Sequence, residues 1–188
     1  MTVLVLGIGN ILWADEGFGV RAVEAFHRLY AMADGVDLLD GGTQGLYLVN
    51  QVAEAERLLV FDAIDYGLPP GRLKVVTGDE VPKFTGAKKM SLHQTGFQEV
   101  LSAADLMDRY PQDIVLIGCQ PLDLEDWGGP LTAPVAASIG PAIALAADIL
   151  AGWGVAPVLR TAPLPPESGL LGNDIDRAAY ERPRADAS

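Results

Sequence analysis

The chain has 188 residues, of which 49% are apolar and 20% charged, a composition typical of a globular protein long enough to bury a core. Its formal net charge of -12 would repel phosphate groups, so we expect neither nucleic acid nor an anionic membrane as a partner. The single cysteine, Cys119, excludes an intrachain disulfide and a multi-cysteine metal site and fits a reducing, cytoplasmic location.

Short β-branched runs alternate with longer helical patterns along the chain, which is typical of an α/β domain. Strands are predicted over residues 2–7, 36–40, 57–63, 71–79 and 113–119, and helices after Glu16 and over 46–55, 95–107 and 133–152. The run 57–63 is apolar on both faces, so it is expected in the centre of the sheet. Cys119 ends a buried strand and is predicted to be an inert core thiol.

The last part of the chain divides into an apolar helix and a proline-rich tail. Residues 139–153 are too short for a bilayer span and contain Pro141 and Asp148, so we predict a buried core helix and no membrane insertion. Residues 156–188 are predicted to be irregular. The expected organisation is therefore one domain over residues 1–155 followed by a tail.

Acidic side chains leave the carboxyl ends of several predicted strands, which is where ligands bind in open α/β sheets. Glu16 follows the first strand, Asp40 ends the second and Asp62 ends the third. His93 lies in a polar loop before the helix predicted over residues 95–107. One imidazole and two carboxylates suit borderline divalent metals and leave coordination positions open for a substrate or water. Spacing alone does not establish such a site, because these residues are far apart in the sequence.

Each of these acidic residues also has a structural interpretation. Asp15 could be the N-cap of the following helix, and Glu16 could complement the dipole at the start of that helix. Asp62 could accept hydrogen bonds from the turn after its strand. Asp40 precedes two glycines, where an Asx-type turn is common.

The turn GIGN at residues 7–10 contains the first two glycines of the dinucleotide-binding pattern G-x-G-x-x-G. Leu12 occupies the place of the third glycine, and residues 11–16 would keep the helix start away from a pyrophosphate. A Rossmann-like nucleotide-binding enzyme that uses Gly7, Gly9 and Asp40 is thus the weaker alternative.

Several stretches together resemble the [NiFe]-hydrogenase maturation endopeptidases. The stretch VLGIGNILWADEGFGVRAVE resembles the N-terminus of that family, and LLDGGTQG (38–45), LLVFDAID (58–65), KKMSLHQTG (88–96) and IGCQPLDLEDWGGPLTAPV (117–135) match in the same order. The resemblance covers roughly residues 1–155. It implies a three-layer α/β/α fold with a twisted, mainly parallel five-stranded sheet and helices on both faces.

The resemblance also implies a function. Members of this family trim the C-terminus of the hydrogenase large subunit, so the expected partner is the large subunit precursor and the expected enzyme is a metal-dependent endopeptidase. Catalytic and nickel-binding roles fall on Glu16, Asp62 and His93, with nickel supplied by the precursor as a recognition element instead of a permanently bound cofactor. The turn implied in substrate handling maps onto Asp40, Gly41, Gly42 and Thr43. We expect a monomer, and a non-catalytic nickel-checkpoint protein is the alternative.

Overall fold

A computed structural model describes residues 1–81, 92–165 and 168–170, without the side chains of residues 92–95. Five strands form one sheet in the order β3-β1-β4-β6-β5, in which only β5 runs antiparallel to its neighbour. The strands are β1 (Val3–Ile8), β3 (Val36–Gly42), β4 (Arg57–Ala63), β5 (Leu73–Thr77) and β6 (Asp113–Cys119). The predicted mainly parallel, five-stranded sheet is confirmed.

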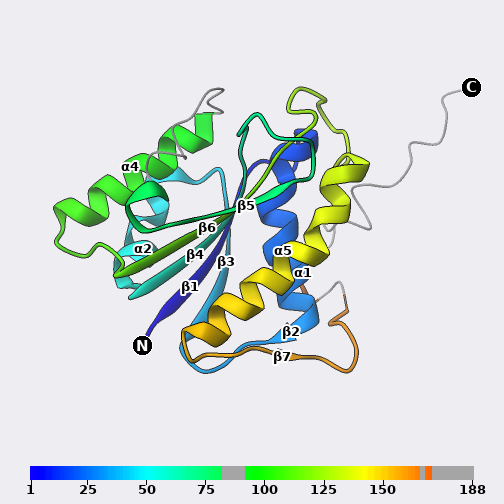
Figure 1. The fold of residues 1–188 in the computed structure, drawn as a ribbon. Helices are drawn as coiled ribbons and strands as arrows, with labels where there is room; N and C mark the ends of the chain where they lie inside the picture. The colour runs from blue at the N-terminus through cyan, green and yellow to red at the C-terminus, as the bar shows by residue number, and fades with distance from the viewer. Residues whose placement is uncertain (82–91, 166–167, 171–188) are drawn as a thin grey trace, which may run out of the picture.

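Helices cover both faces of this sheet (Figure 1). On one face lie α1 (Phe18–Leu29) and α5 (Ala133–Gly152), and on the other lie α2 (Val49–Glu54) and α4 (Leu92–Leu106). The described residues also form three short 3-10 helices: η1 (Ala14–Gly17), η2 (Gly45–Leu48) and η3 (Gly78–Glu80). The three-layer α/β/α class is therefore confirmed.

The two faces of the sheet bury separate apolar clusters, because successive side chains of a strand point to opposite faces. In β4, Leu59 and Phe61 belong to the cluster with α1 and α5, whereas Leu58 and Val60 belong to the cluster with α2 and α4. This central strand is buried from its second residue to its last, as its apolar sequence predicts. The same alternation decides which face each functional side chain occupies.

The helix α5 is long and apolar enough to cross a membrane, judged by length and composition, and no other helix of the described residues is. Its buried residues recur every three or four positions: Val135, Ser138, Ile139, Ala142, Ile143, Ala146 and Leu150. Most of these side chains pack in the cluster shared with α1 and the sheet. This spacing is that of a helix with one face on a core, in agreement with the predicted core helix.

Two elements differ from the sequence-based expectation. The helix predicted from residue 95 begins at Leu92, so His93 lies in the first turn of α4 and not in a preceding loop. Polar residues such as Gln94 are good helix formers, so the polarity of this segment did not mark a loop. In the tail, β7 (Val158–Leu159) pairs antiparallel with β2 (Tyr30–Ala31). Proline is tolerated immediately before a strand, which explains how a proline-rich segment can supply one.

Residues after β7 remain attached to the end of α1. The N–H of Leu164 donates to the carbonyl of Arg28 at 2.9 Å, and Nε of Arg28 donates to the carbonyl of Leu164 at 3.0 Å. Nε2 of His27 lies 3.1 Å from the carbonyl oxygen of Ser168. The described part of the tail is thus held by strand pairing with β2 and by main-chain and side-chain hydrogen bonds with α1.

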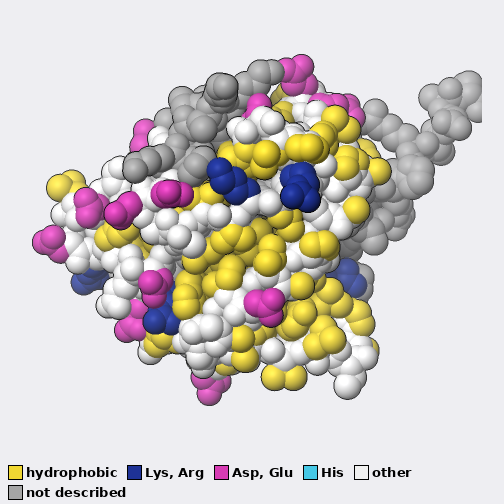
Figure 2. Space-filling model, viewed as in Figure 1, with side chains coloured by type: hydrophobic (Ala, Val, Ile, Leu, Met, Phe, Trp, Pro, Cys, Tyr) yellow, Lys and Arg dark blue, Asp and Glu magenta, His cyan; other side chains and the backbone are white. Residues whose placement is uncertain are grey.

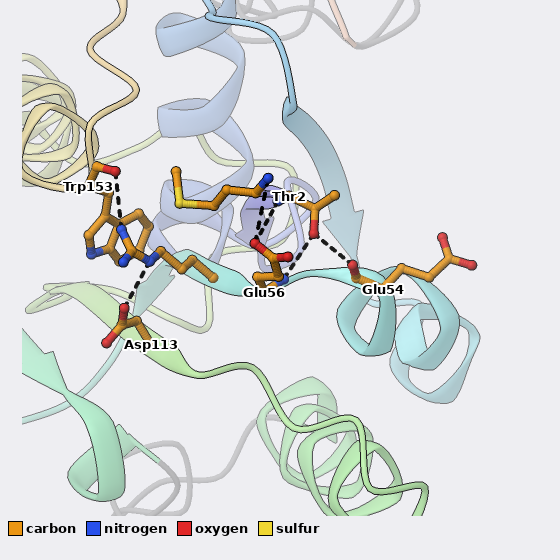
Figure 3. A network of polar contacts seen from close by, with 7 residues as sticks. Thr2, Glu54, Glu56, Asp113 and Trp153 are labelled. Atoms are coloured by element: carbon orange, nitrogen blue, oxygen red, sulfur yellow. Dashed lines mark hydrogen bonds and ion pairs between the residues drawn. The ribbon is translucent and has the colours of Figure 1, made fainter.

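Polar contacts fasten the amino ends of the strands (Figure 3). The N–H of Thr2 donates to Oε2 of Glu56 at 3.2 Å, next to the start of β4. Arg57 forms an ion pair with Asp113 at 2.9 Å, and its Nη1 donates to the carbonyl of Trp153 at 3.2 Å. Because Arg57 and Asp113 are partners in the β4–β6 register, these contacts align the strand starts. They lie at the end of the sheet opposite the candidate site.

Candidate active site

Glycines allow the first loop and α1 to approach the carboxyl ends of β1 and β4. A Cβ atom at Gly19 would overlap the carbonyl oxygens of Ile8 and Phe61. Gly9 has a φ of 138°, and a Cβ atom there would overlap the carbonyl oxygen of Glu16. Glycine is therefore required at both places by close backbone approach. The glycines of this loop bring η1 against the sheet.

Glu16 lies in η1, between the end of β1 and the start of α1. Its N–H donates to the carbonyl of Trp13 at 2.8 Å, and its carbonyl accepts from the N–H of Asn10 at 3.1 Å. The backbone of Glu16 is thus fixed on both sides. Its side chain is half-buried, and this burial raises the pKa of the carboxyl group. Since its carboxylate is partly desolvated, a nearby cation or proton would stabilise it more than in water.

Asp62 is the second-last residue of β4, the strand next to β1, and it is only 2% exposed. The alternation along β4 places Asp62 on the same face as Leu58 and Val60, toward α2 and α4. Because η1 contacts β4, Glu16 and Asp62 come from neighbouring elements at one end of the sheet. That their carboxylates act together stays a prediction.

Tyr66 is a neighbour of Asp62 that the sequence analysis did not identify. Its ring lies over Gly118 of β6, where a Cβ atom would come within 2.7 Å of the ring. The pKa of Tyr66 is raised, first by burial and then by the charge of Asp62, so the phenol stays protonated beside this carboxylate. The sequence signal that could have identified Tyr66 is its place in the turn directly after β4.

Asp40 lies on the other face of the sheet, because Leu38 two residues earlier packs with the α1 and α5 cluster. Its Oδ1 accepts the N–H of Gly42 at 2.9 Å, which is the Asx-type turn expected as the structural alternative. Burial raises the pKa of Asp40, while this hydrogen bond and the charge of Arg21 in α1 lower it. The structure therefore places Asp40 beside α1 and not on the face of Asp62.

The rest of the turn predicted to handle substrate lies close to the end of β1. A Cβ atom at Gly41 would come within 2.7 Å of the Leu6 side chain, and Gly42 has a φ of 44°. Gly42 and Thr43 lie with Ile8 around a small recess. These residues adjoin the same end of the sheet as Glu16, and their role in substrate handling stays a prediction.

His93 belongs to α4, which packs on the face of the sheet that Asp62 also occupies. Its side chain lies outside the described residues, so its role as the third metal ligand stays a prediction. Within residues 1–81, 92–165 and 168–170, excluding the side chains of 92–95, no three histidine, cysteine or acidic side chains form a metal site. The two carboxylates are thus the described part of the predicted triad.

Asp15 does not cap the helix that follows it, so that interpretation is wrong. The N-cap of α1 is Gly17, which makes no side-chain capping bond, because η1 separates Asp15 from α1. The Asp15 carboxylate instead accepts hydrogen bonds from the loop between β6 and α5, at Leu122, Asp123 and Thr132. A residue next to Glu16 therefore joins two loops at the rim of the site.

Cys119 ends β6 in the core. Its Sγ lies 3.1 Å from Oγ of Ser138 in α5, and burial raises the pKa of the thiol to about 11. A protonated, buried thiol is a weak nucleophile, in agreement with the predicted inert role.

Similarity to known proteins identifies the family of this chain. The family model described as hydrogenase maturation protease (HycI) matches residues 20–149. The chain belongs to the hydrogenase maturation protease family. The resemblance noted from the sequence motifs is confirmed, and with it the class of activity, that of an endopeptidase in hydrogenase maturation. The Rossmann-like alternative is set aside.

Relatives and solved structures agree with this membership of the maturation protease family. The chain is 73% identical to the hydrogenase expression/formation protein HupD of Bradyrhizobium diazoefficiens, over 95% of this chain and 93% of the relative. It is 41% identical to the hydrogenase 2 maturation protease of Escherichia coli, over 86% and 98%. The solved hydrogenase maturating endopeptidase HybD from E. coli superposes with a TM-score of 0.81 at 39% identity, covering 86% of this chain and 99% of HybD.

Proposed function

We propose that this maturation protease removes the C-terminal extension of a [NiFe]-hydrogenase large subunit precursor after nickel insertion, and that it recognises nickel in the precursor. The observation that carries the proposal is the pair of desolvated acids Glu16 and Asp62, which come from adjacent elements at the carboxyl end of the sheet. Ligands of open α/β proteins bind at this end. The opposite end is occupied by structural contacts such as the Arg57–Asp113 ion pair.

The donor chemistry of these residues fits a divalent cation that arrives with the substrate. Asp62 is 2% exposed, and burial raises the pKa of Glu16, so both carboxylates would gain from a positive charge brought close to them. Glu16 and Asp62, together with the imidazole of His93, would hold the ion. A divalent metal there polarises a carbonyl oxygen or lowers the pKa of a water molecule.

The chain's own groups supply the rest of the chemistry. The phenol of Tyr66 remains protonated beside Asp62, so it can donate a hydrogen bond to a carboxylate or to a substrate oxygen. Burial of Asp62 keeps water away from its carboxylate, which strengthens its interaction with any charge in the site.

Intact-mass measurement of the precursor tests the proposal. Wild-type protein is expected to shorten nickel-loaded large subunit and to leave nickel-free large subunit at full mass. Asp62→Asn keeps the shape of the side chain and removes its charge, so we expect the cleavage rate to fall by about 100-fold or more. Loss of a residue that only supports a metal ligand costs about 10–100-fold, so a larger fall indicates direct contact with the metal. The exposed Glu99 of α4 provides the control, since Glu99→Gln changes an acid away from the site.

Two outcomes would overturn the proposal. Cleavage of nickel-free precursor at the same rate would remove nickel as the recognition element. Stable binding of nickel-loaded precursor without loss of mass would make the protein a nickel checkpoint and not a peptidase. The monomeric state and the cytoplasmic location stay predictions, and sedimentation of the purified chain tests the former.

A further inference from the structure

Asp15 connects the loop that carries Glu16 to the loop between β6 and α5. Its carboxylate is fully buried. Oδ2 accepts the N–H groups of Leu122 at 2.8 Å and Asp123 at 3.0 Å, and Oδ1 accepts the N–H of Thr132 at 2.7 Å. The hydroxyl of Thr132 also lies 2.8 Å from Oδ2. A buried carboxylate needs such donors, and charge-assisted bonds of this kind are the strong ones.

Further contacts join the same two loops on either side of Asp15. The N–H of Gly128 donates to the carbonyl of Leu12 at 2.7 Å. The rings of Trp13 and Trp127 meet edge to face, with centroids 4.8 Å apart at an angle of 80°, and their backbones form an isolated β-bridge. The loop before Glu16 is thus bound to its partner loop along its length.

The residue between Trp13 and Asp15 has an unfavourable backbone conformation. Ala14 has a φ of 33°, in the left-handed region that is unfavourable for an L-residue with a Cβ atom. Such a conformation persists only where surrounding contacts fix it. The contacts on both sides of Ala14 are those of Trp13 and of Asp15, and the next residue after them is Glu16.

We propose that Asp15 is a positioning residue for the cleavage reaction. Its hydrogen bonds to the loop between β6 and α5 keep Ala14 in the left-handed conformation, and this fixes the direction in which Glu16 presents its carboxylate. The inference rests on the proposed function, in which Glu16 acts directly. Donors of the protein occupy the whole Asp15 carboxylate. Asp15 therefore acts on the reaction only through its neighbour Glu16.

The steady-state kinetics of Asp15→Asn test this inference with nickel-loaded precursor as substrate. The asparagine amide has nearly the same volume as the carboxylate. Its NH₂ group would face N–H donors, so the hydrogen bonds to one of the two oxygens of Asp15 would be lost. Displacement of a reacting group by about 1 Å costs on the order of 100-fold in rate, so we expect kcat to fall by about 100-fold with little change in KM.

The control is Asp148→Asn, the same change at an exposed residue of α5 that lies outside both loops. This variant is expected to retain the wild-type kcat. Thr132→Val removes the hydroxyl contact to Asp15 and keeps the main-chain one, so it should lower kcat in the same direction by a smaller factor. If Asp15→Asn does not fold, the kcat of Thr132→Val still tests the positioning role.

A second measurement does not depend on cleavage. In a Trp153→Phe background only Trp13 and Trp127 remain, one on each loop. Asp15→Asn should increase the quenching of their fluorescence by acrylamide, because the loops separate. Asp148→Asn should leave the quenching unchanged.

The outcomes distinguish failure of the positioning role of Asp15 from failure of the proposed function. Wild-type kcat in Asp15→Asn would overturn the positioning role, and so would a fall in kcat without increased quenching. A rise in KM with unchanged kcat would assign Asp15 to docking and would also overturn it. If wild-type protein leaves nickel-loaded precursor intact, the proposed function fails, while the quenching comparison still tests whether Asp15 holds the loops together.

Discussion

Substitution of Gly19 by alanine should destabilise the protein, although alanine ordinarily stabilises a helix. The added Cβ atom would overlap the carbonyl oxygens of Ile8 and Phe61 and would lie 2.8 Å from the amide nitrogen of Ile8. These are main-chain atoms of two sheet strands, so no side-chain rotation can relieve the overlap. We therefore take the upper end of the usual cost of overpacking, about 3 kcal/mol.

The helix preference of alanine over glycine offsets at most about 1 kcal/mol of this cost. The net expectation for Gly19→Ala is a loss of about 2 kcal/mol in the free energy of unfolding. Gly152 in α5 provides the matched control, because it does not precede a proline and, beyond its chain neighbours and its own helix, no described atom lies within 4 Å of a Cβ atom placed there. Gly152→Ala should therefore raise the free energy of unfolding by about 0.5–1 kcal/mol.

Urea unfolding followed by far-UV circular dichroism measures both changes. The changes in the free energy of unfolding should have opposite signs for Gly19→Ala and Gly152→Ala, with a difference of about 3 kcal/mol. If Gly19→Ala is as stable as the wild type, the close packing of α1 on β1 and β4 is wrong. We also expect Gly19→Ala to cleave precursor more slowly than its folded fraction accounts for, since η1 and Glu16 would move with α1.

Two further predictions concern the core and the tail. Because burial raises the pKa of Cys119 to about 11 from its ordinary 9.0, iodoacetamide at pH 8 should alkylate the chain only after unfolding in urea. The unfolded chain releases this thiol proton first, so stability should fall between about pH 9 and 11 by about 2–3 kcal/mol more in wild type than in Cys119→Ala. In the tail, Nε of Arg160 donates to the carbonyl of Tyr30 at 3.2 Å, so Arg160→Ala should cost about 1 kcal/mol and speed proteolysis after β7. The same change at the exposed Arg109 should alter neither measurement.

Much of the sheet could be predicted from local patterns. The run at residues 57–63 is apolar on both faces, and this alone placed β4 in the centre of the sheet. The direction of β5 could not be obtained in this way, because periodicity reports which residues are buried and not which way a strand runs. The strand β7 escaped detection for a related reason: two residues are too few to show any period.

The candidate site was predictable to the extent that it depends on strand ends. Glu16 and Asp62 could be placed at one end of a parallel sheet from their positions in the chain. Asp40 lies at the same end but on the opposite face, and this separation depends on which helices cover each face. The role of Asp15 was hidden because its hydrogen-bond partners lie more than 100 residues away in the sequence, at Leu122, Asp123 and Thr132.

The position of the N-terminus determines how the enzyme can be immobilised for studies of precursor binding. Met1 lies at the amino end of the sheet, away from η1 and the carboxyl ends of the strands (Figure 1). Its amino group pairs with Glu56 at 3.7 Å in a partly exposed contact, and such pairs contribute little to stability. An apolar surface containing α5 lies on the face seen in Figure 2. A tether through Met1 leaves both this surface and the carboxyl end of the sheet accessible. A biotin or short linker attached there would present the end of the sheet that carries Glu16 and Asp62 to a large protein substrate in solution.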